Sequence, residues 1–394
     1  MSKVNILGVY VSKLNKTKTM EVVRGFLLSK NQHQIVTPNP EFILATREDE
    51  EFYFIINRAD LAIPDGVGLK IAAGLIGQRI HRITGADLIK DILKLAEQEN
   101  RKVAIIFYNG ALSKADDINK ALRKKYPNLQ FVALEAERAW EKFNPDKINN
   151  FKPDIVFTTL GAPYQDKFIY HNLKKIPSAK IGMGVGGAFD FLTGKMQRAP
   201  KWLRLIGLEW LWRLLLEPKR WKRIYNAVLV FSYEFIKWKY FLPFFYRSNV
   251  ACLLFKTEND RKKILIVKRE ELADHWQLPQ GGTDGESLAD AGAREIREEL
   301  GTDKFRVVKI FKNVFKYKFG AGVRKSEPKK HLGYKGQKQG LCTLEFTGVD
   351  EDIKLNFWDH EEWKWVDSDR LIYEVHPMRA EATKRFLEKF NSST

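Results

Sequence analysis

Residues 201–246, KWLRLIGLEWLWRLLLEPKRWKRIYNAVLVFSYEFIKWKYFLPFFY, separate two halves of the chain that carry different sequence patterns. Five of the ten tryptophans lie here among arginines and lysines. Apolar residues recur at roughly helical spacing at Leu203, Ile206, Leu208, Leu211 and Leu215. A helix with this pattern has a wide apolar face bordered by arginines, which suits a membrane interface with anionic headgroups. A core helix with a solvated basic edge is the alternative.

The later part of this stretch does not predict a membrane span. Glu234, Lys237 and Lys239 interrupt residues 227–246, so the apolar run is shorter than the ~20 residues that a spanning helix needs. The N-terminal apolar run is also too short for a signal peptide.

Length and composition indicate the number of domains and the kind of partner. A chain of 394 residues is expected to form two domains rather than one. The 67 Lys plus Arg against 49 Asp plus Glu give a net charge of +18, which predicts an anionic partner such as phosphate groups, nucleic acid or acidic lipid. The two cysteines, Cys252 and Cys342, favour a reducing cytoplasm over a disulfide framework or a cysteine metal site.

Strand and helix patterns alternate in the first half of the chain. A helix is predicted over residues 20–29, and strands over residues 3–11, 34–37, 61–63, 103–107, 131–134, 155–158 and 180–185. This alternation predicts an α/β, Rossmann-like domain with a mostly parallel sheet. Ligands of such sheets bind beyond the carboxyl ends of the strands.

Four predicted strand ends carry polar or glycine-rich sequences. These are TPNPE (37–41), DGVG (65–68), LGAPYQ (160–165) and GGAFD (186–190). The turn at Asp65 can direct a carboxylate into a cavity, and glycines such as Gly186 and Gly187 let backbone amides approach a diphosphate. Each sequence taken singly is typical of an ordinary turn.

A wider set of motifs resembles the WecG/TagA/CpsF glycosyltransferases of bacterial cell-surface polymer synthesis. The resemblance covers nearly all of residues 4–225 and rests on TPNPEF (37–42), IPDGVG (63–68), RITGADL (82–88), LGAPYQD (160–166) and GVGGAFDFLTGKMQRAPKWLRLIGLEWLWRLLLEPKR (184–220). It implies transfer of a hexosamine-type, ManNAc-like sugar from a UDP donor to undecaprenyl-diphosphate-linked GlcNAc. It also implies inversion at the anomeric carbon and no required metal.

An inverting transfer needs a base for the acceptor hydroxyl and positive charge for the departing diphosphate. By the resemblance, Asp65 is the base, Thr37 and Asn39 form an acceptor-side polar pair, and Arg82 and Gln165 are donor-site residues. The glycine pair at residues 186–187 is counted with the substrate site.

Three further arginines match positions of a family segment that closes over the active site and touches the membrane: Arg213, Arg220 and Arg223. The family reading therefore favours a cytoplasmic protein that is peripheral at the inner face of the plasma membrane. A solvated helix face is the alternative for these arginines.

The second half opens with a predicted hairpin whose strands cover residues 250–255 and 263–267. The expected division is therefore a sugar-transferase domain at 1–200, a membrane-associating segment and linker at 201–246, and a second domain at 247–394.

The stretch GGTDGESLADAGAREIREELGT (281–302) carries the clearest chemistry of the second half. On the helix predicted over residues 287–300, Glu295, Glu298 and Glu299 share one face. Such carboxylates repel one another unless a hard divalent cation, Mg²⁺ or Mn²⁺, neutralises them. A solvated acidic helix paired with Arg294 and Arg297 is the alternative.

This stretch resembles the Nudix box, in which Glu286 and residues 294–301 match in register. The glycine loop is one residue short, because four residues rather than five lie between Gly281 and Glu286, and Thr302 replaces the final aliphatic residue. Neither difference removes a metal ligand, although the short loop could misplace Glu286. A mixed-sheet α/β Nudix fold is the expectation.

Three neighbouring motifs, HWQLPQGG (275–282), GYKGQKQ (333–339) and EEWKWVD (361–367), resemble the branch that acts on dinucleoside polyphosphates and RNA 5′-triphosphate ends. By that resemblance Asp359, and next to it Glu361, assists the metals. A basic run is placed to hold the polyphosphate, with a solubilising loop as the alternative: Lys316, Lys318, Arg324, Lys325, Lys329, Lys330, Lys335 and Lys338.

The sequence as a whole indicates a bifunctional enzyme, with an inverting sugar transferase followed by a Mg²⁺-dependent hydrolase of nucleoside polyphosphates. Two alternatives remain open: a transferase regulated by a non-catalytic, nucleotide-sensing Nudix module, and an RNA-binding pyrophosphohydrolase whose lipid contact is incidental. An RNA 5′ end and a second copy of the chain also remain open as partners.

Overall fold

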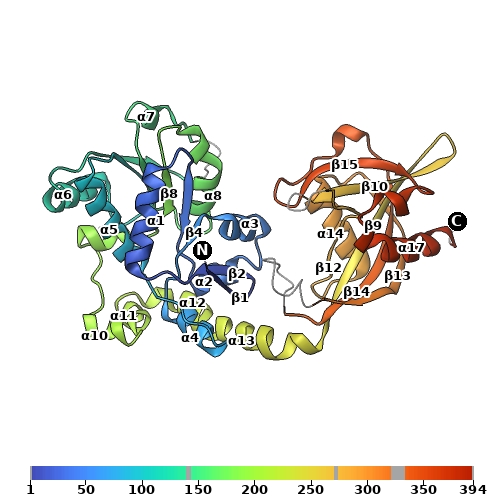
Figure 1. The fold of residues 1–394 in the computed structure, drawn as a ribbon, viewed down its shortest axis with the longest axis horizontal. Helices are drawn as coiled ribbons and strands as arrows, with labels where there is room; N and C mark the ends of the chain where they lie inside the picture. The colour runs from blue at the N-terminus through green and yellow to red at the C-terminus, as the bar shows by residue number, and fades with distance from the viewer. Residues whose placement is uncertain (1, 139–142, 270–273, 321–332, 393–394) are drawn as a thin grey trace. The chain divides into compact units, whose positions relative to one another are not determined.

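The computed structural model describes residues 2–138, 143–269, 274–320 and 333–392. The chain forms two compact units, one ending at Lys237 and the other beginning at Trp238. Each unit has a central sheet of its own, so the predicted α/β class is confirmed for both (Figure 1). Among the described helices, none is both long enough and apolar enough to cross a bilayer.

The first unit is built on a six-stranded sheet in which every pairing is parallel, with the order β4-β3-β8-β7-β5-β6. Its strands are β3 (His33–Val36), β4 (Leu61–Ala62), β5 (Val103–Tyr108), β6 (Phe131–Ala136), β7 (Ile155–Thr158) and β8 (Ile181–Gly184). Most of these side chains are buried, as expected for a parallel sheet that is covered on both faces.

Helices cover both faces of this sheet. Alternate residues of β5 point to opposite sides: Ile105 packs with one group of helices, and Ile106 packs with the other. The first group is α1 (Lys16–Leu28), α5 (Gly85–Gln98), α6 (Ala115–Lys125) and α9 (Ala188–Thr193). The second group includes α7 (Asp146–Asn149) and α8 (Tyr164–Asn172), and α3 (Glu50–Arg58) packs on α8.

The prediction of one strand over residues 3–11 is wrong. The chain turns at Leu7 and Gly8, which have φ angles of 53° and 91°. As a result β1 (Lys3–Ile6) and β2 (Val9–Ser12) pair with each other in an antiparallel, two-stranded sheet. The apolar run is continuous in sequence, so hydropathy alone did not indicate the turn.

Residues 201–244 form a series of short helices rather than one amphipathic helix. The α-helices are α10 (Lys201–Leu205), α11 (Glu209–Leu216), α12 (Trp221–Tyr225) and α13 (Phe231–Ile236), joined by short 3₁₀ and π turns. The break between α10 and α11 lies at Gly207, whose φ is 84° and where a Cβ would stand 2.7 Å from a methyl group of Val67. Val67 begins α4 (Val67–Leu75), so tertiary packing requires glycine at this break.

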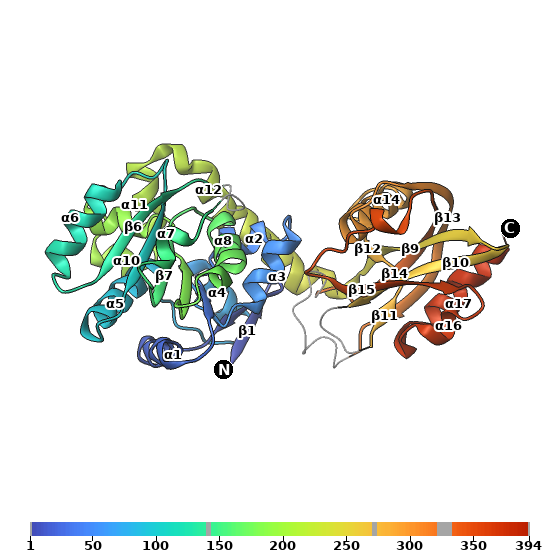
Figure 2. The ribbon, with the colours of Figure 1, turned by 90° about the horizontal axis from the view of Figure 1, so that it is seen from above.

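The second unit contains a seven-stranded mixed sheet between two groups of helices (Figure 2). Its strands are β9 (Tyr246–Glu258), β10 (Arg261–Arg269), β11 (Trp276–Gln277), β12 (Gln280–Gly282), β13 (Phe305–Lys318), β14 (Gly336–Phe346) and β15 (His360–Asp367). The β9–β14 pairing is parallel, and the other pairings are antiparallel. Helix α14 (Leu288–Leu300) packs on one face, and α16 (Leu371–Glu374) and α17 (Pro377–Asn391) pack on the other.

The predicted hairpin at the start of this unit is confirmed by the antiparallel pairing of β9 with β10. Its two turn residues, Asn259 and Asp260, have φ angles of 50° and 58°. Asn and Asp tolerate positive φ better than most residues do, and positive φ at both positions matches the twist of the flanking strands.

Candidate active sites

The loops after β3 and β4 meet the first turn of α5. The Gly85 amide donates to Asp65 Oδ2 over 2.9 Å, and the Asp65 amide donates to the carbonyl of Pro38 over 2.8 Å. A Cβ on Gly85 would lie 3.5 Å from Thr37 Oγ1 and 3.6 Å from Asp65 Oδ2. Adjacent parallel strands therefore place Thr37 and Asp65 together at one edge of the sheet.

The surroundings of Asp65 favour a carboxylate that can accept a proton. Burial raises the pKa of Asp65 above its ordinary value, and the charge of Glu209 raises it further. The Gly85 amide, Arg82 and Arg213 act in the opposite direction and stabilise the charged form. A carboxylate with a raised pKa is a stronger base, and the nearby cations favour its charged form.

Arg82 shares a carboxylate with Arg198, a residue that the sequence did not single out. Arg82 Nη2 donates to Glu209 Oε2 over 2.9 Å, and Arg198 Nε lies 3.7 Å from Glu209 Oε1. The second terminal nitrogen of Arg82 donates to the carbonyl of Arg204 over 3.0 Å. Glu209 and Arg198 lie inside the motif at residues 184–220, but nothing in their spacing distinguishes them from surface charges.

Arg213 of α11 acts on the charge of Asp65, and Arg220 of the following 3₁₀ turn and Arg223 of α12 act in turn on Arg213. Burial lowers the pKa of Arg213, and repulsion from Arg220 and Arg223 lowers it further. Arg223 Nη2 pairs with Glu41 Oε2 at 2.5 Å, which ties α12 to α2 (Pro40–Ala45). The excess of positive charge suits a diphosphate leaving group.

The remaining predicted residues of the first unit divide into two groups. Gln165 of α8 is buried, and its Oε1 accepts from the amide of Gly186, just after β8, over 2.8 Å. Gly187 follows as the N-cap of α9. Asn39 instead caps α2, because its Oδ1 accepts from the Phe42 amide over 3.0 Å. In the structure Asn39 therefore stabilises the start of α2 at the edge of the site.

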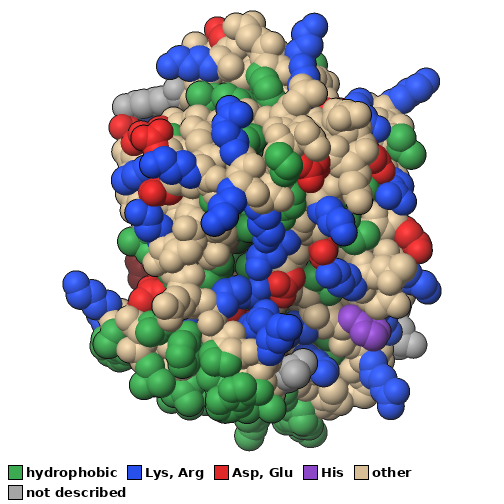
Figure 3. All heavy atoms as spheres, turned by 90° about the vertical axis from the view of Figure 1, so that its left-hand side faces the viewer, with side chains coloured by type: hydrophobic (Ala, Val, Ile, Leu, Met, Phe, Trp, Pro, Cys, Tyr) green, Lys and Arg blue, Asp and Glu red, His purple; other side chains and the backbone are tan. Residues whose placement is uncertain are grey.

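Apolar side chains are exposed along α4 and along the short helices that follow residue 200 (Figure 3). Trp202 is 61% exposed and Leu215 is 70% exposed, and no residue of α11 is buried. The alternative of a core helix therefore does not hold for α11. Lys and Arg side chains adjoin the apolar area on the face seen in Figure 3.

In the second unit, helix α14 places the predicted carboxylates. It begins at Ser287, whose Oγ accepts from the Asp290 amide over 3.2 Å, and ends at Gly301, whose φ is 61°. Ser at the N-cap and Gly at a left-handed C-cap fix the register of the helix. The prediction of a helix over this stretch is confirmed.

Arg294 holds three carboxylates and a carbonyl around it. Its guanidinium donates to Glu286 Oε2 over 2.9 Å, to Glu295 Oε1 over 2.7 Å and to Glu298 Oε2 over 2.9 Å. It also donates to the carbonyl of Gly282 over 2.7 Å. The shortened loop therefore still brings Glu286 to α14.

Gly281 leaves room for the Glu295 carboxylate, since a Cβ at residue 281 would lie 1.9 Å from the carboxyl carbon of Glu295. Both Glu295 and Glu299 are buried. Asn356 brings Asp359 to the end of α14, because Asn356 Nδ2 donates to the Glu298 carbonyl over 3.0 Å and its Oδ1 accepts from the Asp359 amide.

His360, which the sequence did not indicate, lies with Nε2 3.1 Å from Glu299 Oε2. Burial lowers the pKa of His360 to about 4, so the ring is neutral near pH 7. Glu361, the second acidic candidate, pairs instead with Lys268 at 3.3 Å. The geometry therefore favours Asp359 over Glu361 as the further acidic residue of the site.

The donor set on α14 fits a divalent cation in its chemistry. Within the described ranges, no three Asp, Glu, His or Cys side chains are arranged as a ready set of metal ligands. Arg294 accounts for this, because it occupies the position between Glu295 and Glu298. The space that Gly281 leaves beside Glu295 and the oxygen-only donors are what a hard cation requires.

The predicted basic run lies only partly within the described residues. Lys338 is exposed on β14 and pairs in register with Lys316 of β13, whose Nζ lies 4.1 Å from the ring centroid of Tyr246. Lys318 and Lys335 are also described, whereas Arg324, Lys325, Lys329 and Lys330 lie outside the described residues.

Sequence reasoning also missed a polar layer beside β12. Gln339 Nε2 donates to Asn249 Oδ1 over 2.9 Å and to Gln280 Oε1 over 2.8 Å. Arg247 lies next to the same loop, since a Cβ on Gly282 would stand 2.0 Å from its guanidinium. An alternating strand pattern predicts which residues face inward, but it does not identify which polar residues meet.

Comparisons with known proteins match these two units separately. Residues 4–243 match the sequence model described as the glycosyl transferase WecG/TagA/CpsF family, and residues 245–390 match that of the NUDIX domain. An N-acetylglucosaminyldiphosphoundecaprenol N-acetyl-beta-D-mannosaminyltransferase of Bacillus subtilis is 35% identical over 195 residues, which cover 48% of this chain and 74% of that protein. A protein of the same description from Staphylococcus aureus is 30% identical over 247 residues, which cover 60% and 94% of the two chains.

Among solved structures, a binary complex of a Caenorhabditis elegans Ap4A hydrolase is similar to this chain, with 17% identity and a TM-score of 0.29. The match covers 38% of this chain and 99% of that chain.

Proposed function

The chain belongs to the WecG/TagA/CpsF family of glycosyl transferases and carries a NUDIX domain, and from this premise we propose two activities. The first unit transfers N-acetylmannosamine from a UDP donor to GlcNAc-diphosphoundecaprenol. The second unit hydrolyses a nucleoside polyphosphate with the help of Mg²⁺ or Mn²⁺.

The position of Asp65 carries the transferase proposal, together with the two mannosaminyltransferase relatives. Asp65 lies beside Thr37 at the sheet edge and has a raised pKa. In the proposed reaction Asp65 takes the proton of the acceptor hydroxyl while that oxygen attacks the anomeric carbon. The bond from that carbon to UDP breaks, and UDP leaves with the electron pair. The configuration inverts because the acceptor oxygen attacks the face opposite UDP.

The cations around Asp65 have a role in the same step. Arg82 and Arg213 lie close enough to influence the charge of Asp65, and Arg220 and Arg223 add to the positive potential at Arg213. Positive charge that is already in place stabilises the diphosphate as it departs. In this proposal the arginines, rather than a metal, provide the countercharge.

Mass spectrometry of the lipid product tests the transferase proposal. Full-length protein is incubated with UDP-ManNAc and a GlcNAc-diphosphate lipid, and the product is expected to gain one N-acetylhexosamine. UDP-GlcNAc serves as the parallel donor. Absence of any product with folded protein would refute the proposal. A product from UDP-GlcNAc alone would show that the donor sugar is GlcNAc and not ManNAc.

The NUDIX proposal rests on the carboxylate cluster of α14. Glu295, Glu298 and Glu299 would hold a divalent cation, with Asp359 as the further acidic residue, and that cation would activate a water for attack on phosphorus. Arg294 retains Glu286 and the Gly282 carbonyl as partners and so keeps the loop against the helix. The exposed cation at Lys338 is placed to bind the polyphosphate. Dinucleoside polyphosphates and RNA 5′-triphosphate ends are the proposed substrate classes.

A substrate panel tests the hydrolase, with nucleotide and phosphate release as the readout. It contains dinucleoside polyphosphates, triphosphorylated RNA, nucleoside triphosphates and UDP-sugars, each with Mg²⁺. Cleavage of one class that is lost in Glu299→Gln would support the hydrolase and identify its substrate class. Hydrolysis that is unchanged in Glu299→Gln would refute the catalytic reading, and a silent panel would favour the nucleotide-sensing alternative.

We also propose that the first unit is peripheral at a membrane with anionic lipids. The exposed apolar side chains of α4, α10 and α11 adjoin basic residues, as an interfacial segment requires. Leu215→Asp is expected to weaken sedimentation with vesicles that contain phosphatidylglycerol, whereas Leu112→Asp, at another exposed leucine, should not. Retention on RNA with a steep salt dependence and no vesicle binding would instead favour the RNA-binding alternative.

A further inference from the structure

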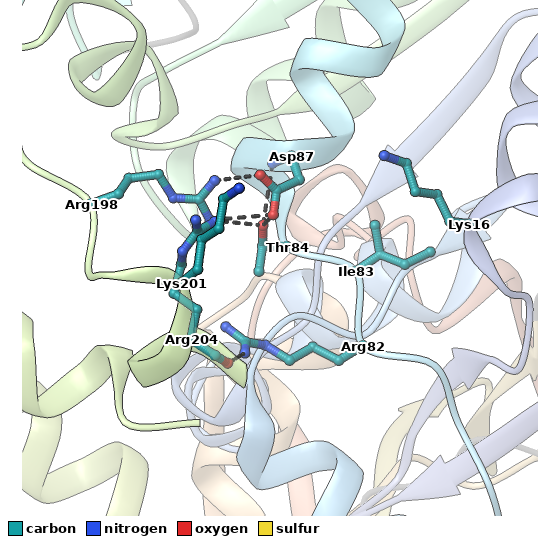
Figure 4. Close-up of a pocket in the computed structure, with 8 residues that line it drawn as sticks. All are labelled: Lys16, Arg82, Ile83, Thr84, Asp87, Arg198, Lys201 and Arg204. Carbon is teal, nitrogen blue, oxygen red and sulfur yellow. Dashed lines mark hydrogen bonds and ion pairs between the residues drawn. The ribbon is translucent and has the colours of Figure 1, made fainter. Parts of the chain in front are cut away.

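A pocket of about 420 Å³ opens beside the candidate base in the first unit. It lies between the first residues of α1 and α5 and the chain that leads into α10 (Figure 4). Five of its lining residues are cations: Lys16, Arg82, Arg198, Lys201 and Arg204. So many cations around one cavity predict an anionic ligand.

Not all of this positive charge is neutralised within the protein. Arg198 pairs with Asp87, and Lys16 pairs with Asp91 at 2.8 Å. Lys201 and Arg204 have no carboxylate partner in the described part of the chain. The positive field extends to Lys90 of α5. Burial lowers the pKa of Lys90, and Arg198 and Arg204 lower it further.

Helix α10 connects this cavity with the apolar surface. Lys201 and Arg204 line the pocket, whereas Trp202 and Ile206 on the same segment are 61% and 59% exposed. Residues 201–206 therefore carry both cations that line the pocket and apolar side chains that are exposed to solvent. An anionic group that carries a long apolar chain fits both features, and a soluble nucleotide fits only the first.

The pocket also adjoins Asp65. Thr84 lines the pocket, and the amide of the next residue, Gly85, donates to Asp65 Oδ2 over 2.9 Å. A ligand that contacts Thr84 is therefore separated from this hydrogen bond only by the peptide unit between Thr84 and Gly85.

We propose that this pocket binds the diphosphate of the lipid-linked acceptor, with the polyprenyl chain along Trp202 and Ile206 and the acceptor sugar directed to Asp65. The inference rests on the proposed transferase function and assigns the acceptor, rather than the donor, to this cavity. Arg82 lines the cavity and is a donor-site residue by the resemblance, so it would lie between the two diphosphates. The donor then lies on the side of Gln165 and Gly186, at the neighbouring strand end.

Direct binding tests the assignment without a need for turnover. The full-length chain is titrated calorimetrically with a GlcNAc-diphosphate that carries a short polyprenyl chain, and separately with UDP. The test variant is Lys201→Glu with Arg204→Glu, in which the Arg204 carbonyl that holds Arg82 is retained. Its matched control is Lys18→Glu with Lys94→Glu, an equal change of charge at exposed positions of α1 and α5 outside the pocket.

The test variant is expected to bind the acceptor analogue about tenfold more weakly or worse, since a charge-assisted contact to phosphate is lost and a repulsion is added. Its affinity for UDP should stay within about twofold, and the control should leave both affinities unchanged. Unchanged acceptor binding, or a loss confined to UDP, would overturn the assignment. If the double variant does not fold, Lys201→Gln at an exposed position replaces it, with the same expectation for the acceptor.

Inorganic pyrophosphate separates the lipid from a free anion. Trp202→Ala should weaken the acceptor analogue but not pyrophosphate, whereas equal effects on both would show that no lipid chain lies on α10. Intact acceptor binding in a chain that transfers no sugar would count against the proposed reaction and not against this pocket.

Discussion

At the scale of single residues, two aspartates of the first unit show how burial acts on carboxylates. Asp65 accepts a backbone hydrogen bond and lies near cations, and both favour the charged form that a base requires. Asp166, the first residue after Gln165, is fully buried, and burial raises its pKa to about 7. Sequence motifs indicated both positions, but only the structure distinguishes their environments.

The raised pKa of Asp65 predicts the pH dependence of transfer. The base must be ionised, so kcat/KM is expected to rise with pH around a midpoint above the ordinary carboxylate value. Arg82 lowers the pKa of Asp65, and Arg82→Gln should therefore move this midpoint to higher pH. The exposed Arg79→Gln is the control. A midpoint that is the same in both variants would contradict the assignment of Asp65 as the base.

Asp166 predicts a pH dependence of stability. Its folded pKa of about 7 exceeds the ordinary 3.8, so the folded state binds more protons between these values and stability falls as pH rises toward 7. From pH 5 to pH 8 the loss should be about 2–3 kcal/mol, and Asp166→Asn should remove it. Denaturant unfolding of the full chain at the two pH values measures this. An equal loss in the variant would show that Asp166 is not the cause.

At the scale of single elements, the sequence predicted the helices and turns whose ends are set by neighbouring residues. The caps at Ser287 and Gly301 fix α14, and the turn at Asn259 and Asp260 fixes the hairpin, so both elements were predictable. The break at Gly207 arises from contact with Val67, which lies far away in sequence. Hydrophobic periodicity carries no information about such a contact, so it predicted a single helix around Leu203 to Leu215.

The packing of β12 against α14 predicts the effect of a single methyl group. Gly281→Ala would place a Cβ 1.9 Å from the Glu295 carboxyl carbon and displace that carboxylate. Hydrolysis and Mn²⁺ affinity are expected to fall about 10- to 100-fold, as for other changes that misplace a metal ligand. Gly320→Ala, where nothing lies within 4 Å of the new Cβ, is the control. Full activity of Gly281→Ala would exclude Glu295 from the metal site.

At the scale of the whole molecule, the chain contains two units, each with its own sheet and core. Composition and the change in pattern near residue 246 predicted two folds and their classes. The sequence did not predict which polar groups meet within them. Glu209, His360 and Arg247 lie at the sites because they contact residues that are distant in sequence: Arg82, Glu299 and Gly282. No local spacing in the sequence encodes such contacts.

Separate cores predict that the second unit works without the first. Residues 238–394 expressed alone should fold cooperatively and hydrolyse the substrate within about threefold of the full-length rate. Thermal unfolding and initial rates on both proteins provide the comparison. An unfolded fragment, or a rate that depends on the presence of the first unit, would point instead to a NUDIX module that is coupled to the transferase.

The central claim is that one chain carries two independent active sites, and reciprocal variants test it most directly. Sugar transfer and nucleotide hydrolysis are measured in parallel on the wild type, Asp65→Asn and Glu299→Gln. Asp65→Asn is expected to lower the rate of sugar transfer about 100-fold or more and to leave hydrolysis unchanged. Glu299→Gln is expected to lower the rate of hydrolysis to a similar degree and to leave sugar transfer unchanged. Loss of both activities in either variant, or of neither, would contradict the account.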